Sequence, residues 1–429
     1  MRSAKNRGEV FNNIGHAIDV DLLRDVFRQL DGKKAVGIDR VTKEQYGEQL
    51  DENLTDLLTR LRRGQYRPKP SRLVEIPKED GSTRLLAISC FEDKLVQHAA
   101  SRVLNAIFEP LFLPSSFGFR EGKSCHDALR SLSQATYKSP DGATVEIDIR
   151  KYFNSIPLGP LQEFLRLKIA DSRFLRLLDS LMTAPTMIDG QAVPNAKGCP
   201  QGSSISPVLA NIYLHYVVDE WFESIKKSHL AGYAYEIRYA DDMVFVFQHH
   251  GDAQRFFNVL PKRLQKFGLE MHSAKSSLVP SGRLAAQRAK SEGKRLPTYS
   301  FLGFTCYWGL AASGKFWRLK FTSRADRFSA KLKGLRRYLW ENLTVRDTNY
   351  FLKKVSAVVR GWITYHAISD NDRRVGSFIL ASKRIILHWL RRRGGQRKPN
   401  WERLVALLGH ACFPERWKTT SLFPKPKRT

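Results

Sequence analysis

The segment "RYADDMVFVF", residues 238–247, places two adjacent acidic side chains inside a run of apolar residues. The aromatic and aliphatic residues on both sides of Asp241 and Asp242 are typical of a buried β-strand. A buried carboxylate that has no partner costs several kcal/mol. The segment therefore raises the question of why two acids stand at this place.

Two interpretations of the acidic pair are open from this segment alone. Asp is common in β-turns, so a tight hairpin would place Asp241 and Asp242 at a loop tip. Alternatively, two strands that meet at such a turn would hold a carboxylate rigidly at one end of a sheet, where it can bind Mg²⁺. A second acidic residue elsewhere in the chain, together with a reason for a metal ion, distinguishes the two.

The charge of the chain indicates a polyanionic partner. Among 429 residues, 71 are Lys or Arg and 42 are Asp or Glu, which gives a net charge of +29. Residues 301–429 hold 28 of the basic and 7 of the acidic residues, so this segment carries +21 of the excess. A chain of this length is expected to form two or three domains. An excess of positive charge concentrated in one part of a folded chain predicts binding to nucleic acid.

Cysteine usage and hydropathy bear on the compartment of the protein. No two cysteines form a C-x-x-C pair, so we expect reduced thiols and no zinc module. The five cysteines are Cys90, Cys125, Cys199, Cys306 and Cys412. The N-terminal "MRSAKNRGEV" has no apolar segment, and no run of about 18 apolar residues occurs, which predicts a cytoplasmic protein without a signal peptide or membrane span.

Hydrophobic periodicity predicts a chain of mixed helices and strands. Apolar residues three and four apart predict helices within 20–63, 91–113, 158–183, the later part of 198–222, and from about 324 to about 393. Alternating patterns predict a hairpin over 66–89, a strand over 143–149, a second hairpin over 235–247, and further β structure at 301–304. The basic segment 281–298 is expected to be an exposed loop or a short helix.

A second acidic residue, Asp148, ends the short strand in "VEIDIRKYFNSI". Taken alone, it could be the N-cap of a following helix. If the strand lies beside the hairpin, however, Asp148 and Asp241 converge at one edge of a sheet. Two carboxylates a few ångströms apart repel each other, and a shared divalent cation relieves the repulsion. Two Mg²⁺ ions roughly 3.5–4 Å apart are the arrangement used in phosphoryl transfer by polymerases.

In these acids, and in a series of segments between about Ala35 and His366, the chain resembles a reverse transcriptase of the group II intron class. The segments occur in the order that this family uses. They are "AVGIDRVT" (35–42), "YRPKPSRLVEIPKEDGSTRLLAIS" (66–89), "SSFGFREGKSCHDAL" (115–129), "VEIDIRKYFNSI" (145–156), "GCPQGSSISPVLANIYL" (198–214), "RYADDMVF" (238–245), "GLEMHSAKSSL" (268–278), "FLGF" (301–304) and "VVRGWITYH" (358–366).

The resemblance implies an α+β chain with the right-hand polymerase fold, which has fingers, a palm built on an antiparallel sheet, and a helical thumb. The implied parts are an N-terminal extension (1–65), fingers (66–142, with 185–200 contributing), a palm (143–310), a basic helical thumb (311–395) and a short C-terminal tail (396–429). An HNH-type endonuclease domain would need cysteine pairs, which the chain lacks, so we expect no such domain.

The resemblance also implies RNA-directed DNA synthesis from dNTPs, with two Mg²⁺ ions, or Mn²⁺ in their place, as cofactors. Asp148 and Asp241 would ligate both ions, the carbonyl of Ile149 would assist, and Asp242 would be a weaker ligand. Lys275 is the candidate for protonating pyrophosphate. The alternative interpretation of Lys275 is an ordinary surface lysine.

Nucleotide-binding residues follow from the same resemblance. Lys78 and Arg84 would clamp the triphosphate, and Gln201 and Gly202 would contact the incoming nucleotide closely. Phe153 would lie under the deoxyribose and exclude a 2′-hydroxyl. The alternatives are a solvated basic turn for the two cations and a core aromatic for Phe153.

Contacts to RNA template and DNA product are expected along the fingers, the primer end and the thumb. Arg120 would contact the template, and Gly303 would allow the backbone to approach the primer. The basic residues of the implied thumb that are expected to contact phosphates include Arg336, Arg337, Lys353, Lys354, Arg360, Arg391, Arg392 and Arg393. Most of the interleaved aromatic residues are expected in the thumb core, with one or two stacking on RNA. They are Trp340, Tyr350, Trp362 and Tyr365.

Three functions follow from these implications, and no oligomeric state is predicted. The first is a group II intron reverse transcriptase and maturase that binds and copies its structured intron RNA. The second is a stand-alone bacterial enzyme of antiviral defence that copies its own cognate non-coding RNA; the departures "PQGSSISP" from PQGSPLSP and "ISC" from IPT favour it. The third is an RNA-binding splicing factor with a dead site, against which the complete acid set argues.

Overall fold

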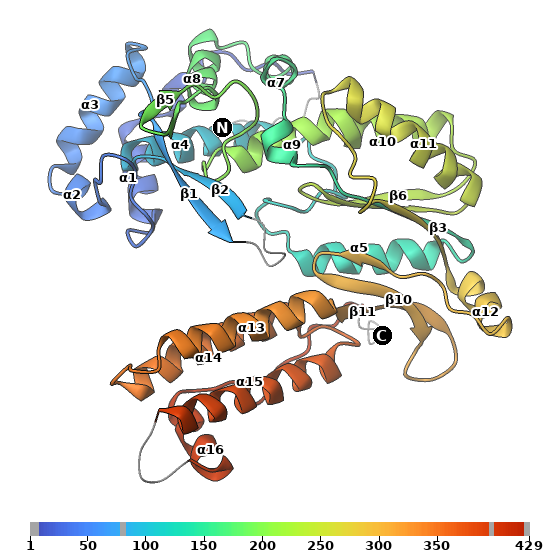
Figure 1. The fold of residues 1–429 in the computed structure, drawn as a ribbon. Helices are drawn as coiled ribbons and strands as arrows, with labels where there is room; N and C mark the ends of the chain where they lie inside the picture. The colour runs from blue at the N-terminus through green and yellow to red at the C-terminus, as the bar shows by residue number, and fades with distance from the viewer. Residues whose placement is uncertain (1–7, 78–82, 394–398, 424–429) are drawn as a thin grey trace, which may run out of the picture. The chain divides into compact units, whose positions relative to one another are not determined.

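The structure is a computed structural model that describes residues 8–77, 83–393 and 399–423 (Figure 1). The chain combines helices with small sheets and divides into two compact units. Unit 1 comprises Met1–Ser124, Ile147–Phe245 and Gly251–Ser277, and unit 2 comprises Cys125–Glu146, Val246–His250 and Leu278–Thr429. In the described part of the chain, no helix is both long and apolar enough to cross a bilayer.

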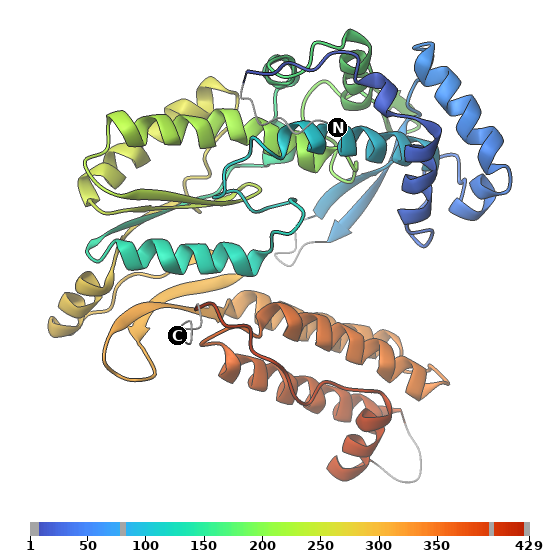
Figure 2. The same ribbon diagram turned by 180° about the vertical axis from the view of Figure 1, so that it is seen from behind.

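Unit 1 begins with helices at the positions that periodicity predicted. They are α1 (Val20–Gln29), α2 (Lys43–Gly47), α3 (Leu50–Arg62) and α4 (Phe91–Phe108), and α1 contacts both α3 and α4 (Figure 2). Side-chain caps fix two of the starts: Asp19 accepts a hydrogen bond from the Leu22 N–H, and Thr42 forms a reciprocal capping box with Gln45. The helix predicted over 91–113 ends earlier, at Phe108.

A four-stranded sheet with the order β2-β1-β4-β5 contains the predicted hairpin of residues 66–89. Its strands are β1 (Ser71–Pro77), β2 (Thr83–Ile88), β4 (Thr186–Ile188) and β5 (Gln191–Val193). β1 and β2 are antiparallel, with Ile76 opposite Arg84, whereas β1 and β4 are parallel. The predicted turn of this hairpin, with Lys78, lies outside the described residues.

The second four-stranded sheet confirms the strand pairing on which the two-acid interpretation depends. Its order is β6-β7-β3-β8, so the strand before Asp148 is hydrogen-bonded to the strand that begins with Asp242. The strands are β3 (Gly142–Ile147), β6 (Ala234–Tyr239), β7 (Asp242–Phe247) and β8 (Ser277–Ser281). Phe245 of β7 packs against Phe222 and Phe256, with ring centroids 4.9 and 4.6 Å away, and this contact anchors the hairpin.

The remaining helices of unit 1 flank the predicted motifs. They are α6 (Tyr152–Ser155), α7 (Leu158–Arg166), α8 (Ser172–Met182), α9 (Ser206–Leu214), α10 (Glu220–Ser228) and α11 (His250–Lys266). The helix predicted over 158–183 is two helices, because Asp171 caps a new start at α8 by accepting from the Arg173 and Phe174 N–H groups. A five-residue π-helical segment, His215–Asp219, lies between α9 and α10. Such segments are frequent at functional sites.

Unit 2 contains a three-stranded antiparallel sheet and a group of helices. Its elements are α5 (Cys125–Lys138), α12 (Arg283–Ser291), β9 (Tyr299–Phe301), β10 (Phe304–Leu310), β11 (Trp317–Ser323), α13 (Ala325–Glu341), α14 (Thr348–His366), α15 (Asp372–Arg392) and α16 (Trp401–His410). The sheet order is β11-β10-β9, so the β structure continues to Ser323 and the implied thumb range of 311–395 begins with a strand.

The helices α13 to α16 share one apolar core (Figure 1). Leu339, Val355, Phe378 and Leu404 come from the four different helices, and each is buried in this core. The helix α16, which lies in the predicted C-terminal tail, therefore packs with the helical group. Because the apolar periodicity is interrupted at "RRRGGQRKP" (391–399), the sequence does not indicate that the residues after 400 pack with these helices.

Candidate active site

Asp241 lies in a two-residue turn between β6 and β7, and Asp242 is the first residue of β7. Ala240, the other turn residue, has a φ of +56°, a conformation that costs energy for a residue other than glycine. Gly118 packs directly on this turn: a Cβ at Gly118 would lie 2.3 Å from the Ala240 nitrogen. The structure thus places Asp241 in a tight turn and Asp242 at the start of the following strand.

Asp148 directly follows β3 and is fixed by its own backbone. Its N–H lies 3.1 Å from the Ser276 hydroxyl oxygen, and its carbonyl accepts a hydrogen bond of 2.8 Å from the His272 N–H. The next residue, Ile149, forms an isolated antiparallel bridge with Met271. The segment 271–276 therefore holds the backbone on both sides of Asp148.

The charges of the two carboxylates interact. Burial raises the pKa of the Asp241 carboxyl above its ordinary value, and the negative charge of Asp148 raises it further. The positive charges of Arg84 and Arg238 oppose this shift of the Asp241 pKa. Asp148 and Arg84, which two further motifs contribute, are therefore close enough to Asp241 in unit 1 to influence the pKa of its carboxyl.

Arg238 is a residue of this site that the sequence analysis did not identify. Its side chain is completely buried, and its Nη1 lies 3.2 Å from the Ala240 carbonyl oxygen and 3.0 Å from the Asn211 Oδ1. Asn211 in turn donates to the carbonyl of Gly118 at 2.7 Å. Arg238 thus holds the turn that presents Asp241. The available signal was a cation inside an apolar strand, which needs a buried partner.

Phe153 lies in the short helix α6, and its ring is half-buried. It makes an edge-to-face contact with Phe119, at 6.2 Å between ring centroids. Its carbonyl accepts a 2.8 Å hydrogen bond from the Cys199 N–H, and a Cβ at Gly198 would lie 2.8 Å from the same carbonyl oxygen. The loop that begins at Gly198 is therefore packed on α6.

The same loop is also joined to the strand that carries Arg84. The Ala87 N–H of β2 donates a 2.7 Å hydrogen bond to the Gln201 carbonyl. Gly202 has a φ of +108°, and a Cβ there would lie 2.6 Å from the Ala87 carbonyl oxygen, so only glycine fits. The loop that contains Gln201 and Gly202 is thereby joined within unit 1 both to the helix that carries Phe153 and to the strand that carries Arg84.

Two of the predicted cations, Lys275 and Arg120, differ in whether their charged groups are available to a ligand. Lys275 is exposed in the turn over residues 273–275, next to the Ser276 that contacts Asp148. Arg120, in contrast, is turned inward: its guanidinium binds Glu109 at 2.7 Å and the carbonyls of Leu113 and Ser116 at 2.7 Å each. The geometry of Arg120 favours a structural role over contact with a template, because its donors are already used.

In unit 2, Gly303 forms a two-residue turn with Leu302 between β9 and β10, with φ values of +78° and +49°. The Tyr365 hydroxyl donates to the Leu302 carbonyl at 2.8 Å, and Trp362 is buried, so both aromatics are structural. Trp340 and Tyr350 are both 57% exposed. Two of the four rings are thus used within the fold, fewer than the majority that the sequence predicted, and Trp340 and Tyr350 stay the candidates for stacking on RNA.

The predicted basic residues of α13 to α15 are exposed, with one exception. The exposed members are Arg336, Arg337, Lys353, Lys354, Arg360, Arg391 and Arg392. Arg393 is half-buried, lies 4.7 Å from the Trp389 ring centroid, and donates to the Val345 carbonyl. Because this carbonyl and ring already engage its guanidinium, Arg393 is better suited to joining α15 to the preceding loop than to binding phosphate.

Two interacting carboxylates beside a strand-borne arginine are the groups expected of an enzyme that transfers phosphoryl groups. Comparison with known proteins identifies the class. Residues 76–306 match the family described as "Reverse transcriptase (RNA-dependent DNA polymerase)". The match covers more than half of the chain, and the protein belongs to the reverse transcriptase family.

Several relatives are named for introns. The Group II intron-encoded protein LtrA of Lactococcus lactis subsp. cremoris is 32% identical over 217 residues, which cover 50% of this chain and 36% of LtrA. An "Uncharacterized 91 kDa protein in cob intron" of Schizosaccharomyces pombe is 41% identical over 172 residues, 40% of this chain and 21% of that protein. Protein YkfC of Escherichia coli K12 is 32% identical over 211 residues, 48% of this chain and 54% of YkfC. The chain thus spans between 21% and 54% of the length of these relatives.

Proposed function

We propose that this protein is an RNA-directed DNA polymerase that copies a structured RNA into DNA by nucleotidyl transfer. The observation that carries the proposal is the pair Asp148 and Asp241, whose charges interact beside Arg84 in a chain of the reverse transcriptase family. A chain that only bound RNA would gain nothing from two carboxylates that repel each other.

The donor set fits a divalent cation. The described residues contain no group of three or more His, Cys, Asp or Glu side chains placed to hold a metal ion. Mg²⁺, however, is often bound by only one or two carboxylates, with substrate phosphates and water completing its shell. Asp148, Asp241 and the Ile149 carbonyl, with Asp242 as a weaker ligand, would hold two Mg²⁺ ions or Mn²⁺. Bound there, the ions would activate the primer 3′-hydroxyl and stabilise the leaving pyrophosphate.

The protein groups around the acids have distinct proposed roles. Arg84 binds the triphosphate, since its charge already acts at Asp241, and Lys78 of the same hairpin assists. Gln201 and Gly202 contact the nucleotide, because a hydrogen bond at Ala87 joins their loop to the strand that carries Arg84. Phe153 lies under the sugar and leaves no space for a 2′-hydroxyl. Lys275 gives a proton to the pyrophosphate.

The same proposal assigns the parts of the right-hand polymerase fold to elements of the structure. The β1–β2 hairpin belongs to the fingers, the β6-β7-β3-β8 sheet forms the palm, and α13 to α15 form the thumb. The exposed cations of the thumb contact phosphates of the template–primer duplex, and the backbone at Gly303 approaches the primer end.

The RNA that is copied is proposed to be a group II intron RNA, because LtrA and the cob intron protein are named for introns. The alternative is a small non-coding RNA encoded beside the gene, as in a stand-alone defence enzyme. Sequencing the RNA that co-purifies with the protein decides between them. An intron with flanking exons supports the first, and a short non-coding RNA supports the second.

Primer extension tests the polymerase proposal itself. The purified protein should extend a DNA primer on an RNA template with dNTPs, require Mg²⁺ or Mn²⁺, and stop when EDTA is added. Substitution of rNTPs for dNTPs should give little product. The absence of DNA product under all these conditions, in protein that still binds RNA, would overturn the proposal.

A further inference from the structure

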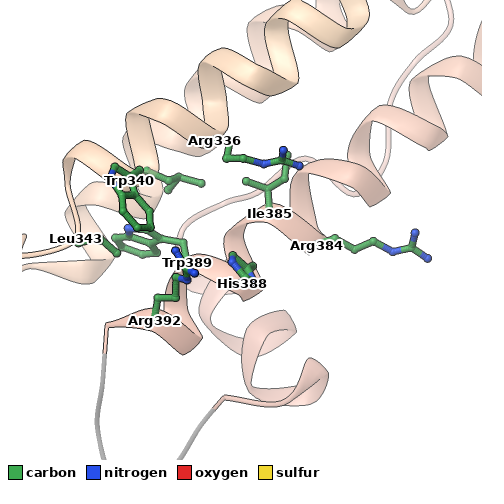
Figure 3. A pocket seen from close by; sticks show the side chains of 9 residues that line it. Arg336, Trp340, Leu343, Arg384, Ile385, His388, Trp389 and Arg392 are labelled. Atoms are coloured by element: carbon green, nitrogen blue, oxygen red, sulfur yellow. The ribbon is translucent and has the colours of Figure 1, made fainter.

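We propose that the groove between the C-terminal parts of α13 and α15 binds an unpaired nucleotide of RNA. The inference rests on the proposed function and names the form of RNA that the helical part of unit 2 recognises. The groove has a volume of about 430 Å³, which lies within the range of roughly 300–1,000 Å³ typical of ligand pockets. Its main lining residues are Arg336, Trp340, Arg384, His388, Trp389 and Arg392 (Figure 3).

Trp340 provides the stacking surface of this groove. It is 57% exposed, although an indole is among the most apolar groups that a surface can carry. The guanidinium of Arg392 lies 4.9 Å from its ring centroid, so a planar cation already occupies a stacking position on this residue. An aromatic ring flanked by arginine is the surface on which unpaired bases stack.

Trp389 provides a directional contact beside the stacking surface. It is 3% exposed, and its indole Nε1–H has no acceptor among the residues that the structure describes. A buried donor that lacks an acceptor is unfavourable and is rare in folded proteins. Trp389 lines the same groove as Trp340, so a carbonyl oxygen or ring nitrogen of a bound base can accept from it.

The rim of the groove is basic. Arg336, Arg384, Arg391 and Arg392 are exposed, and a second hollow lined by His388, Arg391, Arg392, Pro399 and Asn400 adjoins the first. Within the described ranges, none of these arginines forms an ion pair with a carboxylate, whereas neighbouring Arg337 lies 3.9 Å from Glu341. Cations without acidic neighbours are suited to phosphates on both sides of a base.

The combination selects an unpaired nucleotide over the other candidates, and the proposed function identifies RNA as the strand that supplies it. A base inside a duplex is stacked on its neighbours and cannot reach Trp340, while phosphates alone would leave the indole and the Trp389 donor without partners. The chain carries a net charge of +29, which favours a polyanion over a protein of mixed charge. An acidic peptide is the competing ligand that the test has to exclude.

Three fluorescein-labelled RNA hairpins with the same stem test the inference on the full-length protein. One is fully paired, one has a single unpaired adenosine in the stem, and one has an abasic ribose at that position. Wild-type protein should bind the bulged hairpin on the order of tenfold more tightly than either of the others, because only that hairpin offers a base for stacking.

Variants then assign the preference to the groove. Trp340→Ala should abolish the preference for the bulge, and Trp340→Phe should retain most of it. Trp401→Ala, which removes another exposed tryptophan of unit 2, is the matched control and should bind as wild type does. Arg336→Ala should weaken binding of the bulged hairpin more than Arg337→Ala, its neighbour outside the groove. An unchanged melting temperature for Trp340→Ala, which is expected for an exposed residue, shows that the fold is intact.

The outcomes separate this inference from the proposed function. Equal affinity of wild type for the three hairpins, or a preference that survives in Trp340→Ala, overturns the groove assignment even when primer extension is normal. Loss of bulge preference in Trp340→Ala, with wild-type addition of one nucleotide to a saturating primer–template, supports it. A protein that shows bulge preference but makes no DNA would contradict the polymerase proposal alone.

Discussion

Arg238 and Asp219 form a bidentate ion pair inside unit 1, with Nε 2.7 Å from Oδ1, Nη2 2.7 Å from Oδ2, and neither residue exposed. Asp219 is the last residue of the π-helical segment, and Arg238 also holds the carbonyl of Ala240. Burial alone would raise the pKa of Asp219, but the charge of Arg238 and the hydrogen bonds at the carboxylate bring the pKa below its usual value. The position of the turn that carries Asp241 therefore depends on a fully buried ion pair.

Replacing Arg238 with Lys keeps the charge but removes the fork that binds Asp219 and the Ala240 carbonyl together. We expect the kcat of DNA synthesis to fall by about tenfold to a hundredfold, since small displacements of reacting groups have effects of this size. The KM for dNTP should change little, because the loop with Gln201 and Gly202, which we propose to bind the nucleotide, is untouched. Arg288→Lys, in an exposed pair with Asp141, is the control and should alter neither quantity. A larger change in KM than in kcat would contradict the positioning role.

The raised pKa of Asp241 predicts the acid limb of the pH profile. Protons and Mg²⁺ compete for the ionised carboxylate, so at low Mg²⁺ concentration activity should fall on acidification at a higher pH than an ordinary aspartate, with a pKa of about 3.9, would give. Arg84 opposes the rise, so Arg84→Gln should raise the Asp241 pKa further and move the acid limb of kcat/KM to higher pH. A limb that stays in place, or moves to lower pH, would show that Arg84 does not act on Asp241.

The contact between Gly118 and the turn predicts the effect of a single methyl group. In Gly118→Ala the new Cβ would lie 2.3 Å from the Ala240 nitrogen, so the turn must move. We expect a large loss of primer extension with retained RNA binding. Gly159→Ala is the control, since a Cβ there meets nothing within 4 Å, and this change in a helix should stabilise the protein by up to about 1 kcal/mol. Equal activities of the two variants would mean that the turn tolerates the displacement.

The exposed arginines at the end of α15 predict a salt dependence. In a salt titration of binding to an RNA–DNA duplex, replacing both Arg391 and Arg392 with Ala should flatten the log–log slope by up to about two phosphate contacts, at roughly 0.7–0.9 each. Lys383→Ala is the control on the same helix, because Lys383 is already paired with Glu415 at 2.6 Å. A slope that changes as little in the double variant as in the control would leave these arginines without a role in duplex binding.

The sequence alone was sufficient to predict those parts of the site whose backbone structure depends on the local pattern of apolar residues. Alternation of apolar residues located the hairpin around Asp241 and the strand before Asp148, and the pairing of these strands is confirmed. The role of Arg238 was not accessible in this way. Its partner lies 19 residues earlier in a π-helical segment, and no helical or strand period predicts such a segment.

Charge counts likewise do not separate exposed arginines from internal ones. Arg120 and Arg393 were predicted to bind nucleic acid, yet the guanidinium of Arg120 binds Glu109 and two backbone carbonyls, and that of Arg393 donates to the Val345 carbonyl. Trp340 and Trp362 present the same difficulty, because one indole is exposed and the other is buried in the helical core. The distinction depends on which side of each helix the neighbouring helices cover.

DNA synthesis by variants of the two acids tests the central claim most directly. Asp148→Asn and Asp241→Asn keep the size of the side chain but remove the charge that a divalent cation requires. Each should abolish primer extension on an RNA template at any Mg²⁺ concentration, while RNA affinity and melting temperature stay close to wild type. Glu270→Gln, which changes an exposed acid paired with Arg150 next to the Ile149–Met271 bridge, should remain active. Extension within about tenfold of wild type by either aspartate variant, a loss of less than roughly 1.4 kcal/mol in transition-state stabilisation, would contradict the assignment of Asp148 and Asp241 as the metal-binding pair.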